Sequence, residues 1–323
     1  MNGPQTPPFK CIATGVELTQ AEDSKAHVLP NAIGGRLKPK GVLSRQGNTL
    51  IGDLIESPFI KQYQSLISVL GGKRQRGQHP DFKVEGEDGK SYLMRHDGST
   101  TLAAPEYRHE GDFLHLSART KAELNDLLMK AKKEYPETDT EGALQGASLV
   151  ETPTPSVTFH MNVGPDVLFP VAFAAAATFN AWKGLPVHPF FKAYLQQLKG
   201  GNKKLPPDTF YWEPEHPWLD TPHAGTHTVC TVLSRRKAQV LTIVRLVGLP
   251  SVAILTDYNG SRNRVVSSTV DIIKGELLYI VPNAQYIVNQ NWSETHKLGE
   301  AAIMQLIKSR ADEALSLAGL GRI

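Results

Sequence analysis

The sequence predicts an α+β protein whose strands pair in antiparallel fashion. Apolar residues recur at three- and four-residue spacing over 50–70 and 304–318, a pattern that indicates amphipathic helices. Short runs elsewhere alternate apolar and polar residues, and Asp-Gly and Asn-Gly pairs, which are typical of hairpin turns, separate them. With 323 residues, 40% of them hydrophobic, the chain is long enough for two or three domains with their own cores.

We expect four consecutive segments. They are a flexible Pro-rich lead-in at 1–10, a small domain at 11–78, a β-meander with a helix at 79–155, and an α+β domain at 156–323. In the small domain, apolar spacing from Leu50 to Leu70 predicts a helix that Pro58 kinks or divides. The pair Gly71-Gly72 ends it.

The segment 79–155 begins with short runs between 82 and 117, which predict a meander. Thr120 and Glu123 form a T-x-x-E capping box, so a helix should follow and end before Pro136. The polar stretch 137–155 predicts a long connection.

The C-terminal segment should start with a half-buried strand at 157–163, because apolar and polar residues alternate there. An uncharged run at 167–182 predicts a buried helix, since it is too short to span a bilayer. An amphipathic piece follows at 190–198. Strands are then expected at 226–233, 239–247, 251–256, 265–273 and 277–281, and a last helix at 304–318.

Cysteine content and charge bound the setting. Cys11 and Cys230 are too few for a disulfide framework, and the start of the sequence shows no signal-peptide pattern, so a reducing cytoplasm and no membrane association are expected. The net charge is +3, but residues 1–83 hold eleven Lys and Arg against six Asp and Glu. The basic charge therefore accompanies the N-terminal part of the chain.

The stretch from Ser24 to Glu56 carries the strongest signal for chemistry. His27 stands beside a predicted turn, and Asn48 stands at the entry to the predicted helix, where it could also be the N-cap. The basic residues in and after this stretch predict a phosphate-binding surface, although a solvated loop would have the same composition. These candidate nucleic-acid-binding residues are Arg36, Lys38, Lys40, Arg45, Lys73, Arg74 and Arg76.

Three sequence pieces resemble the HNH endonucleases, in the branch written roughly C-x-x-C, then S-K-E-H-x-I-P-N-x-x-G-G, then C-x-x-C-N. They are CIAT at 11–14, SKAHVLPNAIGG at 24–35 and SRQGN at 44–48. The resemblance implies that 11–78 is a ββα-metal domain, with two antiparallel strands and a helix. It also implies a metal-dependent endonuclease that hydrolyses DNA phosphodiester bonds, with Mg²⁺ or Mn²⁺ as cofactor.

The same resemblance implies roles for particular residues. His27 would be the general base, since a neutral imidazole can take a proton from water near pH 7. Asn48 would fix the catalytic loop or ligate the metal, and Glu56 would be a second metal ligand, because hard cations prefer oxygen. The larger C-terminal region would position DNA or bind a protein partner.

The chain departs from the pattern at two sites. Ala26 stands where related sequences have an acidic metal ligand, and of the four zinc cysteines only Cys11 is present. A structural zinc is therefore not expected, because Thr14, Ser44 and Gly47 occupy the other positions. Packing should replace the metal, with Val42, Leu43, Leu50 and Leu54 as contributors. A catalytically silent protein that binds nucleic acid or a partner is the alternative function.

Other candidates have ordinary structural explanations that we prefer. His223, His227 and Cys230 have spacing that would suit zinc on a helix, but a strand from Thr226 would separate the last two onto opposite faces. The pairs Lys203-Lys204 and Arg235-Arg236 match solvated turns. An aromatic group could stack bases, but a packed Pro-rich loop is the preferred interpretation. It comprises Phe210, Tyr211, Trp212 and Trp218.

Overall fold

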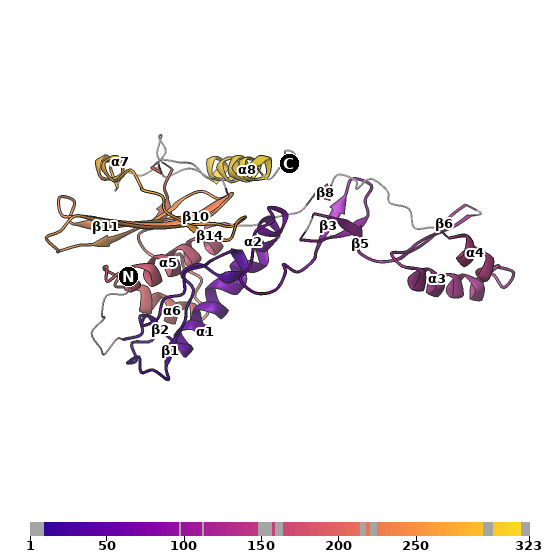
Figure 1. Ribbon diagram of the computed structural model, residues 1–323, viewed down its shortest axis with the longest axis horizontal. Coiled ribbons are helices and arrows are strands. Elements are labelled where there is room, and N and C mark those ends of the chain that lie inside the picture. The colour runs from indigo at the N-terminus through magenta and orange to yellow at the C-terminus, as the bar shows by residue number, and fades with distance from the viewer. Residues whose placement is uncertain are drawn as a thin grey trace. The chain divides into compact units, whose positions relative to one another are not determined.

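The structure is a computed structural model of the whole chain, and it describes residues 10–96, 98–111, 113–147, 157–158, 164–213, 218–219, 225–292 and 300–317. The fold is α+β, and all strand pairs among these residues are antiparallel. Two compact units are present, Met1–Gln78 with Met161–Ile323 and His79–His160 (Figure 1). The segments expected at 11–78 and 156–323 thus share one unit. Nearly all of the expected lead-in lies outside the described residues.

A six-stranded sheet organises the first unit, with strand order β14-β13-β10-β11-β12-β9. Helices α7 and α8 lie over one face, whereas α5, α6 and the N-terminal segment lie over the other (Figure 1). The strands are β9 Thr209–Tyr211, β10 Thr226–Ser234, β11 Gln239–Arg245, β12 Val252–Asp257, β13 Arg264–Asp271 and β14 Glu276–Leu278. The helices are α5 Pro165–Trp182, α6 Phe191–Lys199, α7 Ala284–Asn289 and α8 Glu300–Leu317.

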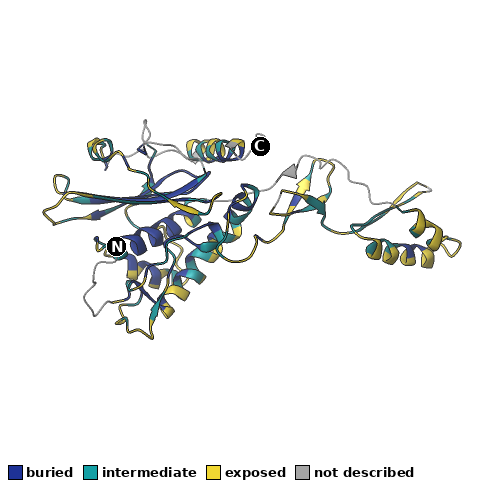
Figure 2. Cartoon of the chain, viewed as in Figure 1, coloured by how far each residue is buried: buried dark blue, intermediate teal, exposed yellow. Residues whose placement is uncertain are grey.

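Strand β10 is buried at every position because both faces of the sheet are covered (Figure 2). Its side chains alternate between the faces. Cys230 and Val232 pack with Trp212 and with residues of α7 on one side. On the other side Asn180 of α5 accepts a hydrogen bond from Thr231, so this buried amide is paired.

The N-terminal segment forms two short strands followed by a helical run. Strand β1 Asp23–Ser24 pairs with β2 Leu43–Ser44, and the turn η1 Asn31–Ile33 lies between them. The helical run comprises α1 Arg45–Ile51, the π-helical turn η2 Gly52–Glu56 and α2 Ser57–Val69.

The helical run begins earlier than the predicted Leu50, and Asn48 is not its N-cap. Ser44 is the N-cap, since its side chain accepts a hydrogen bond from Gly47 N. The apolar periodicity did not reveal the first turn, because Arg45 and Gln46 are exposed there. Pro58 lies in the first turn of α2, directly after the π-helical turn. The run is continuous through Pro58, so the expected kink or division takes the form of the π-helical turn just before this residue, and α2 ends before Gly71-Gly72.

The second unit contains a sheet of order β5-β4-β3-β8, a β6–β7 hairpin and two helices. Thr120 is the N-cap as predicted, because it accepts a hydrogen bond from Glu123 N, whereas the Glu123 carboxylate accepts from Arg119 N. The prediction of an unstructured connection at 137–155 is wrong over α4, which Asp139 caps by accepting from Gly142 N. The elements are β3 Phe82–Gly86, β4 Ser91–Met94, β5 Thr100–Leu102, β6 Glu106–Glu110, β7 Phe113–Ser117, α3 Lys121–Glu134, α4 Thr140–Gly146 and β8 Val157–Thr158.

Across the described ranges, none of the helices combines the length and the apolar character that crossing a membrane requires. Of the strand expected at 157–163, only β8 falls within those ranges.

Candidate functional site

The loop between β1 and β2 holds His27 and folds tightly on itself. Val28 N donates to Leu37 O at 3.0 Å and closes the loop. Gly34 has φ of 93°, a conformation that favours glycine, and ends the turn η1. At Gly35 a Cβ atom would lie 1.9 Å from Leu29 O, so no larger residue fits without movement. The sequence NAIGG therefore specifies this loop.

His227 anchors the loop to the six-stranded sheet. Its Nε2 atom donates to Ile33 O at 2.7 Å, and its Nδ1 atom accepts from Val247 N at 3.1 Å. Tyr63 of α2 donates its hydroxyl to Val247 O. Burial lowers the pKa of His227 to about 4, so the ring is neutral at pH 7. Both ring nitrogens of His227, a possible zinc ligand by its spacing in the sequence, are thus hydrogen-bonded to the backbone.

Cys230 lies on the opposite face of β10 from His227 and packs in the apolar cluster beside Trp212. Its thiol is fully buried, and burial raises its pKa. His223 lies outside the described residues. A zinc site built on His227 and Cys230 is therefore wrong, because strand geometry separates the two side chains.

His27 is partly buried and differs sharply from His227. Burial lowers its pKa to about 4, and the positive charges of Lys38 and Arg76 contribute to the lowering. An interaction with the Gln75 side chain raises the pKa, but by less than these effects lower it. Within the described part of the chain its Nε2 atom is covered from solvent and has no hydrogen-bond partner. A neutral imidazole with an unpaired nitrogen can accept a proton, but a general base must also reach the attacking water, and this nitrogen is closed to solvent.

Gln75 brings two basic stretches of sequence together beside His27. Its side-chain amide donates to Gly35 O and Arg36 O, both at 3.3 Å, and its backbone N donates to Asn31 Oδ1 at 2.9 Å. Arg36 donates in turn to Lys73 O at 3.1 Å. The loop that follows α2 is thereby fixed against the His27 loop.

Six of the seven predicted phosphate-binding residues belong to these two stretches. Arg45 is the exception: it lies exposed at the start of α1, and its backbone N donates to Glu22 O. None of the seven forms an ion pair with a described residue. This basic cluster consists of Arg36, Lys38, Lys40, Lys73, Arg74 and Arg76.

The predicted metal ligands on the helical run differ in their exposure. Asn48 is exposed on α1, and Ala26 is fully buried. Glu56 lies on the π-helical turn, where burial raises its pKa to about 7, so it is only partly ionised at neutral pH. In the described residues no three His, Cys, Asp or Glu side chains gather closely enough to hold a metal. The roles of Asn48 and Glu56 as metal ligands therefore stay predictions.

Glu22, Asp23 and Asp53 are the nearby carboxylates that could replace the ligand missing at Ala26. Asp23 is engaged in the loop, since its Oδ1 atom accepts from Gly41 N at 2.8 Å. Glu22 and Asp53 have exposed side chains.

The four positions that correspond to zinc cysteines do come together. Ser44 Oγ donates to Cys11 Sγ at 3.3 Å, and Thr14 also hydrogen-bonds the thiol. A Cβ atom on Gly47 would lie 2.7 Å from Cys11 Sγ. Burial raises the pKa of Cys11, but the hydrogen bonds from Ser44 and Thr14 outweigh burial and lower it overall. Hydrogen bonds and close packing thus surround the Cys11 thiol.

Packing around this cluster differs in part from expectation. Val42 and Leu43 are buried as predicted. On the helical run Ile51 and Ile55 are buried, whereas Leu50 and Leu54 are only partly covered. The helix starts one turn earlier than expected and presents a different face to the core.

The remaining sequence candidates are structural or exposed. Trp212 and Trp218 are buried in the core, where they contact each other edge-on and cannot stack on a base. Lys203 and Lys204 are exposed in a loop, and Arg235 and Arg236 are exposed in the β10–β11 turn.

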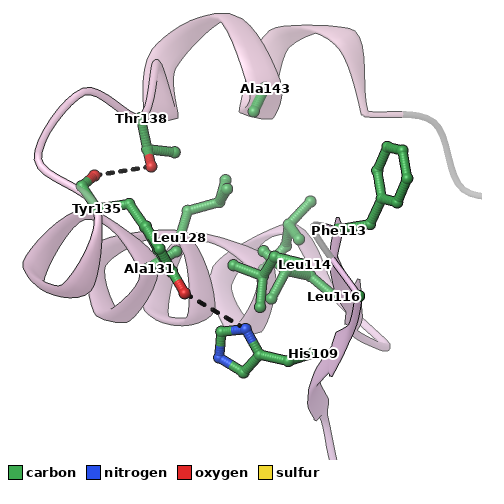
Figure 3. Close-up of a pocket in the computed structure, with 11 residues that line it drawn as sticks. His109, Phe113, Leu114, Leu116, Leu128, Ala131, Tyr135, Thr138 and Ala143 are labelled. Atoms are coloured by element: carbon green, nitrogen blue, oxygen red, sulfur yellow. Dashed lines mark hydrogen bonds between the residues drawn. The ribbon is translucent and has the colours of Figure 1, made fainter.

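A separate pocket of about 640 Å³ lies in the second unit, among β6, β7, α3 and α4 (Figure 3). Leu114, Leu116 and Leu128 line its apolar floor. At its rim the Tyr135 hydroxyl contacts His109 Nδ1 at 3.4 Å. The pocket thus combines apolar side chains with polar groups.

Sequence reasoning missed Gln75 and the anchoring role of His227, and only the structure shows them. Comparison with models of protein families, with curated proteins and with solved structures found no match.

Proposed function

We propose that the chain is an HNH-type endonuclease that hydrolyses phosphodiester bonds in DNA, with His27 as general base. The observation that carries the proposal is the convergence of positions 11, 14, 44 and 47 around Cys11 Sγ. The resemblance predicts that the pair 11 and 14 meets the pair 44 and 47, since the four positions would hold the zinc cysteines, and the Ser44–Cys11 contact joins these pairs. The order β1, β2, α1 is also that of a ββα motif.

His27 and the basic cluster have complementary tasks in this proposal. The cationic side chains would bind the phosphate backbone, and the neutral imidazole would accept a proton from the attacking water. Binding an anion beside His27 would counteract Lys38 and Arg76, which disfavour its protonation. A divalent cation would stabilise charge on the phosphate, but its donor set is incomplete in this chain.

A nucleic-acid-binding protein without nuclease activity is the second candidate. Buried Ala26 and the lack of a carboxylate cluster among the described residues favour it. Both candidates place nucleic acid on the same basic cluster. Because both cysteines are free thiols, we propose a reducing compartment, the cytoplasm, for either function.

A plasmid-cleavage assay with Mg²⁺ or Mn²⁺ separates the two candidates. The parent, His27→Ala, Ala26→Glu and Ala26→Gln are compared, with Gln as the neutral control of equal size. Cleavage by the parent that His27→Ala abolishes would support the endonuclease. If only Ala26→Glu cuts, the scaffold is intact but lacks a ligand.

Thermal melting of each variant controls for misfolding, because Ala26 is fully buried and a carboxylate there is costly. Folded variants that never cut with either metal would exclude the endonuclease and leave the binding function.

A further inference from the structure

An exposed apolar row begins on β14 and continues into the residues that follow this strand. Tyr279 is 96% exposed, and Leu277 and Val281 are 55% and 52% exposed. These residues alternate with Leu278 and Ile280, which are more covered. Ile280 packs against the apolar cluster on the α7 face of the sheet. Because side chains alternate along an extended chain, Tyr279 points to the opposite face.

That opposite face is the one on which the His27 loop rests. Leu277 pairs with Val270 of β13, and directly paired residues share a face. Val270 and Ser268 line a small cavity with Arg36 and Leu37 of the loop. Continuing the strand register by one more pair places Tyr279 opposite Ser268. The exposed tyrosine therefore belongs to the same surface as the loop.

The basic cluster reaches the start of this row. A Cβ atom on Gly275, the residue before β14, would lie 2.3 Å from a guanidinium nitrogen of Arg36 and 3.3 Å from Lys73 Cβ. From Gly275 to Tyr279 an extended chain advances about 13 Å. The acidic residues nearby, Asp271 and Glu276, are paired with each other across the strands and lie on the other face.

We propose that this surface binds single-stranded nucleic acid, with Tyr279 as the platform on which an unpaired base stacks. The inference rests on the proposed nucleic-acid function and names its substrate class. An exposed aromatic ring that shares a surface with cations is the combination that single-strand binding uses, since cations hold phosphates and the ring holds a base. In an intact duplex the bases are already stacked inside, so an exposed ring adds little there.

The test measures fluorescence anisotropy of a labelled single strand of about 16 nucleotides and of the matching duplex, at one salt concentration and with EDTA to prevent cleavage. Tyr279→Ala should weaken single-strand binding about 5- to 150-fold and leave duplex binding unchanged. Tyr279→Phe should retain binding within about twofold, because the ring is kept. Phe113→Ala removes a 74% exposed ring from the second unit and should have no effect.

Equal affinity of Tyr279→Ala and the parent for the single strand would overturn the proposal. So would sedimentation showing a parent dimer that Tyr279→Ala dissociates, since the row would then be an interface between copies. These outcomes are independent of catalysis. If the folded protein binds single strands through Tyr279 but never cuts, the endonuclease fails and this inference stands. If the protein cuts duplex DNA and Tyr279→Ala does not change single-strand binding, the endonuclease stands and this inference fails.

Discussion

Two histidines of the first unit show how local environment assigns a role. His227 has both ring nitrogens hydrogen-bonded to the backbone and is fully buried, so it holds structure together. His27 is only partly buried, and its Nε2 atom lacks a partner in the described part of the chain. Both pKa values are about 4, but only His27 lies beside cations that could bind a substrate.

We predict that His27 titrates near pH 4, as followed by NMR of its ring protons. Burial and Lys38 disfavour the imidazolium, so Lys38→Gln should raise the pKa, whereas Lys61→Gln on α2 should not. An unfolded chain binds this proton more readily, near the usual 6.5. The contribution of His27 to stability is therefore complete above about pH 6.5 and falls as the pH drops toward 4. A midpoint near 6.5 in the folded protein would contradict the assignment.

At the scale of elements, the helical run after β2 contains two glycines with opposite surroundings. Gly47 lies against Cys11 and Ala13, while a Cβ atom on Gly52 would meet nothing within 4 Å. Gly52 has helical angles, with φ of −55° and ψ of −49°. One glycine is required for packing, and the other only weakens the helix.

Gly47→Ala should therefore lower the free energy of unfolding by about 1–3 kcal/mol through overpacking. Gly52→Ala should raise it by about 0.5–1 kcal/mol, because alanine loses less entropy in a helix. Urea unfolding measures both changes. Adding Cys11→Ala should relieve part of the Gly47→Ala cost, and strict additivity of the two substitutions would argue against the contact.

Local patterns predicted local elements well, and long-range pairings poorly. The helix after Thr120 and the strands at 82–117 follow from capping and turn residues within a few positions of each other. No local pattern predicts that His227 bonds Ile33, because the partner is a backbone carbonyl 194 residues away. The small α7 was missed, since six residues are too few for a helical period to be recognised.

Within the candidate site, the sequence indicated that positions 14, 44 and 47 do not hold zinc cysteines, but it did not predict that Ser44 and Gly47 contact Cys11. It could not predict Gln75, because this residue acts through backbone groups of the loop. The proposed role of Asn48 came from the resemblance and that of Glu56 from spacing, and neither the exposure of Asn48 nor the raised pKa of Glu56 could be predicted from such patterns.

At the scale of the whole molecule, the second unit is an insertion into the first. It comprises 79–160, and the chain of the first unit resumes at Met161. Strands β3 and β8, near its two ends, are paired neighbours, with Glu85 opposite Thr158. Because the chain enters and leaves through adjacent strands, the two ends of the insertion are close together.

We predict that replacing 79–160 by a Gly-Ser linker of about eight residues leaves the first unit folded, with a melting temperature within a few degrees of its value in the full chain. Calorimetry of the full chain should show two transitions, of which the shortened protein keeps one. A single cooperative transition that the deletion abolishes would show that the units depend on each other.

The hydrogen bond between His227 and Ile33 can form only late in protein synthesis. The two residues are 194 positions apart, and Tyr63 and Val247 are 184 apart. At a synthesis rate of about 5–20 residues per second, the His27 loop waits roughly 10–40 s for the strands that hold it. A ribosome-bound chain therefore carries the loop without its anchor, so the candidate site is completed only when most of the protein has been made.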